Sequence, residues 1–254
     1  MTSSNEPVLN PSDLLAYRRA NGQLSEFAVP RAVIFSPQKS LAAYILRRHS
    51  TKQVKGFLGD FYLLKRTGGQ IAISTNFGIG APVVAGLTDE FAALGVKQFA
   101  LVGMAGGIQP DMSSGSLVIS TNAIRGEGVS RHYLPPHPTI DSSTEMVQGV
   151  SEVLTKQNYP HALGTTWTTD APFRELRRDI IEHQRNGVLA VDMEAAALLA
   201  VATSMNLPAV AAFSIADQLS DGHWRMTSDQ RLAQKGLTVL FDAILEYLMG
   251  QFRK

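Results

Sequence analysis

The sequence predicts an α/β protein built around a largely parallel sheet that helices cover on both sides. From residue 31 onward, short apolar runs alternate with amphipathic stretches of helical length. Strands that are apolar on both faces and separated by helices are typical of such a sheet. The chain has 254 residues, of which 44% are hydrophobic and 18% charged. This length suffices for one domain with a full core, and the composition excludes a disordered or fibrous protein.

Seven apolar runs are expected to be strands, at 32–35, 70–75, 98–104, 116–121, 162–168, 187–191 and 208–216. Six intervening stretches are expected to be helices, at 40–49, 82–94, 143–157, 173–184, 193–206 and 228–252. Pro82 suits the first turn of the second helix, and the tripeptides LGV and NLP are typical helix stops. The chain contains no linker, repeat or low-complexity tract. We therefore expect an N-terminal extension over 1–30 and a single domain over 31–254.

Composition excludes several classes of function. The formal net charge is +1, so nothing indicates a nucleic acid or an anionic membrane as a partner. The absence of cysteine excludes disulfides and thiolate chemistry, and the six histidines lack the spacing of a metal site. The N-terminus lacks the apolar core of a signal peptide, and no run of about 18 apolar residues could span a bilayer. We expect a cytoplasmic protein that uses no metal and no cofactor.

Three glycine-rich or polar stretches follow predicted strands, where ligands of α/β sheets gather. They are NFGIGAP at 76–82, GMAGGIQPDMSSG at 103–115 and IADQLSDGHW at 215–224. Glycines such as Gly78 and Gly106 let the backbone approach a ligand and turn N–H groups toward an anion. Each stretch alone is equally compatible with an ordinary tight turn.

The stretch AVDMEAAA at 190–197 is less ordinary. It carries Asp192 and Glu194, and the following residues bear no charge until Asp217. An unpaired buried carboxylate costs several kcal/mol or becomes neutral. A helix dipole accounts for Asp192, but Glu194 is followed by three alanines and has no obvious cation. A polar partner, either elsewhere in the protein or a ligand, is therefore expected.

These motifs, in this order, resemble the nucleoside phosphorylase family that includes uridine phosphorylase and hexameric purine nucleoside phosphorylase. The resemblance rests on NFGIGAP, GMAGGIQPDMSSGSLVI, TTDAPFRE, VDMEAAALLAVA and FSIADQLSDG, and runs from about residue 31 to the C-terminus. It implies a three-layer α/β fold around a mixed sheet, no metal cofactor, and phosphate as co-substrate. It also implies a homo-oligomer, a dimer or a hexamer of dimers, whose subunits share active sites.

The resemblance implies roles for the acidic residues. Glu194 would accept hydrogen bonds from ribose hydroxyls while Met193 packs under the sugar, with Asp192 as an auxiliary acid. A fixed carboxylate holds the sugar as positive charge develops on it. Asp217 resembles the acid that protonates N7 of a purine leaving base, although an Asp after a strand also commonly caps a loop.

Other residues of the predicted substrate site are less specific. Phe173 and Trp224 could stack on the base or belong to the core. Met104 stands where the family has a Thr or Ser that bridges phosphate and ribose, and Gly106 lies beside it.

The phosphate site departs from the family pattern. The usual Gly-Asp-Pro-x-Arg loop is replaced by FSPQK, so that Lys39 stands for the arginine, and Lys55 matches an arginine donated by the neighbouring subunit. Leu101 replaces a third arginine, and the N-terminal histidine that reaches the neighbour's sugar has no counterpart. Lysine cannot reproduce the bidentate fork of arginine on phosphate. Backbone N–H groups near Gly78 would help to hold the anion.

Two arginines could replace the missing guanidinium. Arg174 in DAPFRE is preferred, Arg125 is the other candidate, and a salt bridge of Arg174 with Glu175 or Asp170 is the alternative. Three functions remain open. Phosphorolysis of a purine nucleoside is favoured narrowly, and hydrolysis by water needs no phosphate clamp. A binding protein without catalysis is disfavoured because the residues Asp192, Met193, Glu194 and Asp217 occur together.

Overall fold

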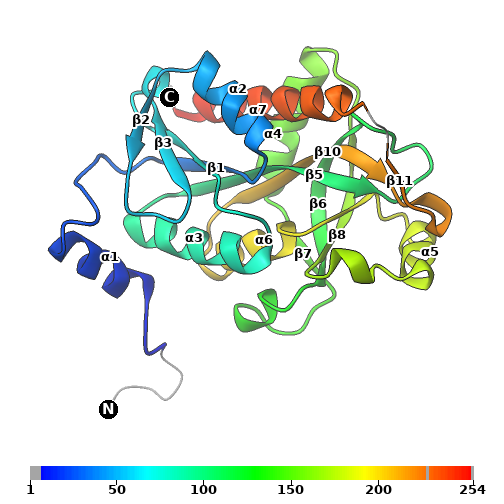
Figure 1. The fold of residues 1–254 in the computed structure, drawn as a ribbon, viewed down its shortest axis with the longest axis horizontal. Coiled ribbons are helices and arrows are strands. Elements are labelled where there is room, and N and C mark those ends of the chain that lie inside the picture. Colours follow the sequence, from blue (N-terminus) through cyan, green and yellow to red (C-terminus); the bar gives the residue numbers. More distant parts are fainter. Residues whose placement is uncertain (1–6, 227–228, 253–254) are drawn as a thin grey trace.

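The computed structural model describes residues 7–226 and 229–252, and it contains a mixed sheet with helices on both faces (Figure 1). The fold class is as predicted. The strands are β1 (Ala32–Ser36), β2 (Thr51–Val54), β3 (Asp60–Leu64), β4 (Ile71–Thr75), β5 (Gln98–Gly107), β6 (Leu117–Gly126), β7 (Thr139–Asp141), β8 (Ala162–Thr169), β9 (Ala190–Asp192), β10 (Ala209–Gln218) and β11 (Arg225–Met226). The helices are α1 (Pro11–Ala20), α2 (Lys39–Arg48), α3 (Ala81–Leu94), α4 (Thr144–Lys156), α5 (Arg177–Arg185), α6 (Ala195–Ser204) and α7 (Arg231–Phe252).

The centre of the sheet is parallel. Strands β4, β1, β5 and β10 pair in parallel in that order, with Ile34 of β1 in register with Ile73 and Ala100. β2 and β3 extend the β4 edge as antiparallel strands. On the other side, β10, β6, β8 and β9 pair in turn and β9 returns to β5, which closes this half into a ring of five strands. The carboxyl ends of β1, β4, β5 and β10 therefore meet at one edge.

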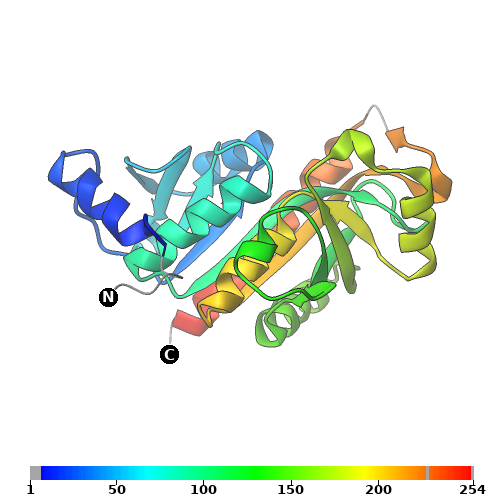
Figure 2. The same cartoon turned by 90° about the horizontal axis from the view of Figure 1, so that it is seen from below.

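Alternation along the strands creates two cores. In β1, Ile34 packs with residues of α2, α4 and α7 on one face of the sheet, and Phe35 packs with residues of α3 and α6 on the other. Figure 1 shows α2 and α7 above the sheet and α3 and α6 below it, and Figure 2 looks onto the face that α3 and α6 cover. Because these side chains are fully buried on both faces, hydrophobic burial fixes the register of the strands.

The described part of the predicted N-terminal extension lies against the domain. Leu15 of α1 and Leu24 are buried in the core beside α3. Arg18 of α1 forms an ion pair with Glu90 of α3. Residues 1–6 of the predicted extension lie outside the described residues. The division of the chain at residue 30 stays a prediction.

All the predicted strands and helices have counterparts, with shifted ends. The helix predicted over 173–184 begins at Arg177, because residues 172–174 form a separate 3₁₀ turn that starts at Pro172. The strand predicted over 187–191 shortens to β9, since Gly187 adopts a left-handed φ of 73° in the turn after α5. The predicted start of the last helix at 228 lies outside the described residues, and α7 begins at Arg231. None of the described helices is long and apolar enough to cross a membrane.

Candidate active site

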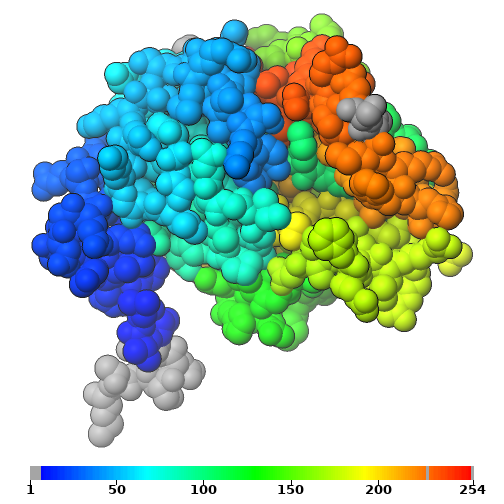
Figure 3. Space-filling model, in the orientation of Figure 1, coloured from blue at the N-terminus to red at the C-terminus, as the bar shows by residue number. Residues whose placement is uncertain are grey.

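A cavity of about 580 Å³ opens at the carboxyl ends of the central strands. Figure 3 shows the hollow on this face, where the blue and cyan N-terminal segments meet the yellow-green and orange C-terminal segments. Segments far apart in the sequence contribute to it: the loop after β1, the ends of β5, β9 and β10, and the loops after β4, β8 and β10. Its lining comprises Gln38, Ile79, Met104, Ala105, Gly106, Pro172, Phe173, Glu175, Val191, Asp192, Met193, Glu194, Ala216, Asp217, Leu219 and Trp224.

Asp192 is held by the protein itself. Its Oδ1 atom accepts hydrogen bonds from the backbone N–H of Glu194 at 2.8 Å, the N–H of Ala195 at 2.7 Å and the hydroxyl of Thr168 at 3.0 Å. The carboxyl group thus satisfies N–H groups at the start of α6, where the helix dipole favours a negative charge. Burial raises its pKa to about 6, and these hydrogen bonds oppose the rise.

Glu194 is only 4% exposed and has a different partner. Its Oε1 atom accepts a hydrogen bond of 2.7 Å from the N–H of Gly80, the residue that caps the start of α3. Gly80 has a φ of 105°, a backbone conformation that favours glycine. Burial, and then the charge of Asp192, raises the pKa of Glu194 to about 7, and the Gly80 N–H opposes the rise. One backbone donor leaves this carboxyl group able to accept further hydrogen bonds from a ligand.

Asp217 and Trp224 lie together at another end of the cavity. The indole Nε1 of Trp224 donates a hydrogen bond of 2.6 Å to Oδ2 of Asp217. Burial raises the pKa of Asp217, and this hydrogen bond opposes the rise. A Cβ at Gly106 would lie 2.3 Å from Cδ1 of Leu219 and 3.6 Å from Oδ1 of Asp217, so a larger residue there would displace the Leu219 side chain. The indole face remains accessible, since Trp224 is 65% exposed.

Glu175 is a member of this site that sequence reasoning missed as a functional residue. It lines the cavity just after the 3₁₀ turn that follows β8, and it forms no hydrogen bond or ion pair with any described residue. Burial, followed by the charge of Asp217, raises its pKa to about 7. Its position shortly after a predicted strand was the available signal, but the predicted helix over 173–184 assigned this acid to a helix.

The cavity brings together eight of the predicted site residues: Met104, Gly106, Phe173, Asp192, Met193, Glu194, Asp217 and Trp224. The side chains of Lys39, Lys55 and Arg174 are exposed and do not line it, and neither does Gly78. Phe173 is 98% exposed at its rim. Leu101, where the family pattern has an arginine, is fully buried in the core.

The side chain of Arg125 bonds only to the segment that follows β6, among the described residues. Its guanidinium donates hydrogen bonds to the carbonyl oxygens of Leu134 and Pro135 and to the hydroxyl of Ser130. An arginine with these partners organises the segment after β6 and does not reach the cavity lining. The acid side chain of Asp170, predicted as a partner of Arg174, accepts instead from the N–H of Gly128.

The described lining of the cavity is acidic. It contains four carboxyl groups, those of Glu175, Asp192, Glu194 and Asp217, and it includes neither lysine nor arginine. Across the described residues, no group of three or more His, Asp or Glu side chains is arranged to hold a metal ion.

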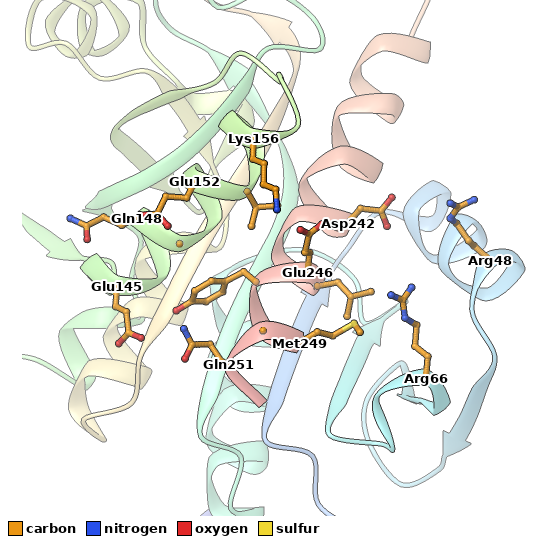
Figure 4. Close-up of a pocket in the computed structure, with 15 residues that line it drawn as sticks. Arg48, Arg66, Glu145, Gln148, Glu152, Lys156, Asp242, Glu246, Met249 and Gln251 are labelled. Carbon is orange, nitrogen blue, oxygen red and sulfur yellow. The ribbon is translucent and has the colours of Figure 1, made fainter. Parts of the chain in front are cut away.

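A larger cavity of about 940 Å³ lies among α2, α4 and α7 (Figure 4). Arg48, Arg66 and Lys156 border it together with acids that include Asp242 and Glu246. Tyr44 donates to Asp242, and Gln157 donates to Glu246. The charges are mixed and two of the acids already have partners. None of the predicted site residues lies in this cavity.

Comparison with known proteins assigns the family. The sequence model of the Phosphorylase superfamily matches residues 34–248. The chain therefore belongs to the Phosphorylase superfamily, as the resemblance of its motifs predicted.

Individual relatives are distant. The chain is 31% identical to a guanosine phosphorylase of Halorubrum lacusprofundi over 163 residues, which cover 62% of this chain and 66% of that protein. It is 26% identical to uridine phosphorylase of Escherichia coli over 155 residues, which cover 56% of this chain and 61% of that protein. The chain thus spans less than two thirds of the length of each. The crystal structure of an AMP nucleosidase from Bacteroides thetaiotaomicron shares the fold, with a TM-score of 0.71 at 21% identity over 87% of this chain and 91% of the other.

Proposed function

We propose that this chain hydrolyses the N-glycosidic bond of a purine nucleoside and releases the free base and the free sugar. The observation that carries the proposal is the charge of the cavity, which has four carboxyl groups and no cation in its described lining. At an effective dielectric constant of about 20, two unit charges about 4 Å apart interact by about 4 kcal/mol. A phosphate dianion would therefore find no cation to pair with in the described lining, whereas a neutral water molecule needs none.

The sugar is assigned to the end of the cavity at Glu194 and Met193. The backbone N–H of Gly80 holds the Oε1 atom of Glu194 in place. The remaining lone pairs of the carboxyl group accept hydrogen bonds from ribose hydroxyls. A fixed carboxylate in a buried setting stabilises the positive charge that develops on the sugar as the glycosidic bond breaks. The half-buried thioether of Met193 provides an apolar contact for the sugar ring.

The base is assigned to the end at Asp217. The exposed ring of Trp224 provides a stacking surface, and Phe173 at the rim provides a second one. A purine leaving group departs more readily when N7 is protonated, and the raised pKa of Asp217 suits a group that supplies this proton. Glu175 lies within the electrostatic range of Asp217, whose charge adds to burial in raising the pKa of Glu175.

The proposed step conserves atoms and charge. The bond between C1′ and the base nitrogen breaks, and its electron pair leaves with the base, which takes a proton from Asp217. The oxygen of a water molecule bonds to C1′, and the resulting oxonium releases one proton to solvent, from which Asp217 is reprotonated. The net reaction adds H and OH across the glycosidic bond. The chain's own residues bind, orient and transfer a proton, and no cofactor is required.

Phosphorolysis is the second candidate. The names of the curated relatives favour it, and Lys55 is an exposed cation on the loop after β2. In a homo-oligomer with shared sites, which stays a prediction, Lys55 of a neighbouring subunit would supply a charge that the described cavity lacks.

A product assay tests the proposal. Inosine, guanosine, adenosine and uridine are each incubated with the protein, with and without inorganic phosphate, and the sugar products are identified. Hydrolysis predicts free ribose from the purine nucleosides at a rate that phosphate does not raise. Ribose 1-phosphate would support the second candidate, and a full panel without product would contradict both.

A further inference from the structure

The larger cavity, of about 940 Å³ among α2, α4 and α7, shares no lining residue with the candidate active site. Two arginines border it from different elements. Arg48 is the last residue of α2, and Arg66 belongs to the 3₁₀ turn that follows β3. Neither forms an ion pair or a hydrogen bond with another described residue. Figure 4 shows both guanidinium groups on the side of the cavity where Asp242 lies.

A buried histidine beside the cavity indicates that the two arginines converge. His49 follows Arg48 at the end of α2 and is 6% exposed. Burial lowers the pKa of His49, the charges of Arg66 and Arg48 lower it further, and the charge of Asp242 opposes them. Both guanidinium groups therefore act on one ring. Two cations around one ring repel each other, and an anion between them would relieve this repulsion.

Asp242 does not neutralise both arginines. Its Oδ2 atom accepts a hydrogen bond of 2.7 Å from the hydroxyl of Tyr44. A single carboxylate can balance the charge of only one guanidinium group. This side of the cavity therefore keeps a positive charge, which favours an anion.

The other side of the cavity favours hydrogen-bond donors. Glu145 and Glu152 extend from α4, and Figure 4 places them across the cavity from the two arginines. Glu246 of α7 also borders the cavity, and Lys156 is the cation that α4 contributes. The acids thus outnumber the cation there. Carboxylates accept hydrogen bonds from the hydroxyl groups of a ligand.

We propose that this cavity binds a small sugar phosphate, with its phosphate between Arg48 and Arg66 and its hydroxyl groups on the acids of α4. The planar fork of arginine pairs with two phosphate oxygens at once, so two arginines from different elements can hold one phosphate on two sides. The cavity is large enough for the whole ligand, since ligand pockets commonly measure about 300–1,000 Å³. The proposal holds whichever nucleophile the candidate active site uses.

Calorimetric titration with ribose 5-phosphate tests the site. Arg48→Gln and Arg66→Gln should each weaken binding about tenfold, the effect of losing one charge-assisted contact to the phosphate. Arg47→Gln is the matched control, because Arg47 is the exposed neighbour of Arg48 on α2 and does not line the cavity. It removes the same charge and should weaken binding by less than about threefold, since exposed charges are screened.

Two further titrations examine the rest of the ligand. Glu152→Gln should lower the affinity for ribose 5-phosphate relative to the affinity for inorganic phosphate, because only the sugar phosphate carries hydroxyl groups. Adenosine 5′-monophosphate separates the two sources of a pentose phosphate. Tighter binding of this nucleotide than of ribose 5-phosphate, with the same dependence on Arg48 and Arg66, supports the site with a nucleotide as its ligand.

The outcomes decide the proposal independently of the reaction. Equal losses in Arg47→Gln and Arg48→Gln would show general attraction to a basic surface and overturn the site. Absence of binding of either phosphate ester to the wild type at about 10 mM, well above the millimolar range of weak sites, also overturns it. An unchanged affinity ratio in Glu152→Gln overturns the placement of the sugar on α4. Arg48→Gln should cleave nucleosides as the wild type does, so a failure of the proposed hydrolysis leaves the titrations readable.

Discussion

At the scale of single residues, the carboxyl group of Glu194 is buried with one backbone donor, the N–H of Gly80. Glu194→Ala should lower kcat/KM for a purine nucleoside by about a hundredfold or more, the usual loss when one positioned electrostatic contact is removed. Steady-state kinetics measures this, with circular dichroism as a control for folding. Near-normal turnover in a folded variant would remove the sugar-binding role.

Asp217 is argued to donate a proton to the leaving base. Asp217→Asn should lower the rate on purine nucleosides by about 10²–10⁴. The variant should act almost normally on p-nitrophenyl riboside, because this leaving group departs without protonation. Trp224→Phe is the companion variant, since it keeps an aromatic ring and removes the N–H that binds Asp217. Equal losses of Asp217→Asn on both substrates would contradict the assignment.

The raised pKa of Glu194 has a consequence for stability. Its pKa moves from 4.5 to about 7 on burial, so the folded state holds the proton over a range in which the unfolded state has released it. The contribution to the free energy of unfolding is largest below the unfolded pKa and is lost as pH rises toward the folded pKa.

As pH rises from about 5 to about 8, the free energy of unfolding should therefore fall less for Glu194→Gln than for the wild type. Urea denaturation across this range measures the difference, and Glu26→Gln, at an exposed position, serves as the control. Parallel pH profiles for wild type and Glu194→Gln would show that the carboxyl group is not shifted as described.

At the scale of elements, the start of α6 depends on Asp192. Its carboxyl group holds two backbone N–H groups and the Thr168 hydroxyl, all buried. Asp192→Ala removes a helix cap and leaves buried donors unsatisfied, so the free energy of unfolding should fall by about 3 kcal/mol. Ser143→Ala at the start of α4, where the hydroxyl accepts one longer hydrogen bond of 3.4 Å, should cost less than about 1 kcal/mol. Thermal and urea unfolding compare the two, and a similar cost for both would argue against the buried cap.

The sequence predicts the long elements well because their signals are local. Apolar runs such as the one at 32–35 are buried on both faces in β1, and Pro82 lies in the first turn of α3. Two of the elements that were missed depend on distant partners. β2 has the polar sequence TKQV and is a strand because β3 pairs with it, and β11 is two exposed residues against the end of β10.

The candidate site likewise contains residues with a local sequence signal and residues that depend on distant partners. The acids in AVDME were recognisable because carboxylates are costly in an apolar segment, and one oxygen atom of each accepts a backbone hydrogen bond in the structure. Their partners, Thr168 and Gly80, could not be read from the sequence, since they come from other strand ends. Glu175 and Gln38 enter the cavity through the packing of loops after β8 and β1, which no local pattern reveals.

At the scale of the whole molecule, the fold places four carboxyl groups and an amide at one edge of the sheet and leaves the matched lysines Lys39 and Lys55 exposed. Membership of the Phosphorylase superfamily does not decide between phosphorolysis and hydrolysis. The choice between them therefore depends on the nucleophile, which the charge of the cavity argues to be water.

The most direct measurement follows the oxygen atom that reaches C1′. The wild-type protein is incubated with guanosine or inosine in ¹⁸O-enriched water containing inorganic phosphate, the sugar product is trapped by reduction as it forms, and its mass is measured. Hydrolysis predicts free ribose that carries one ¹⁸O atom, at a rate independent of the phosphate concentration. Ribose 1-phosphate without the label, formed in proportion to phosphate, would contradict the proposed hydrolysis.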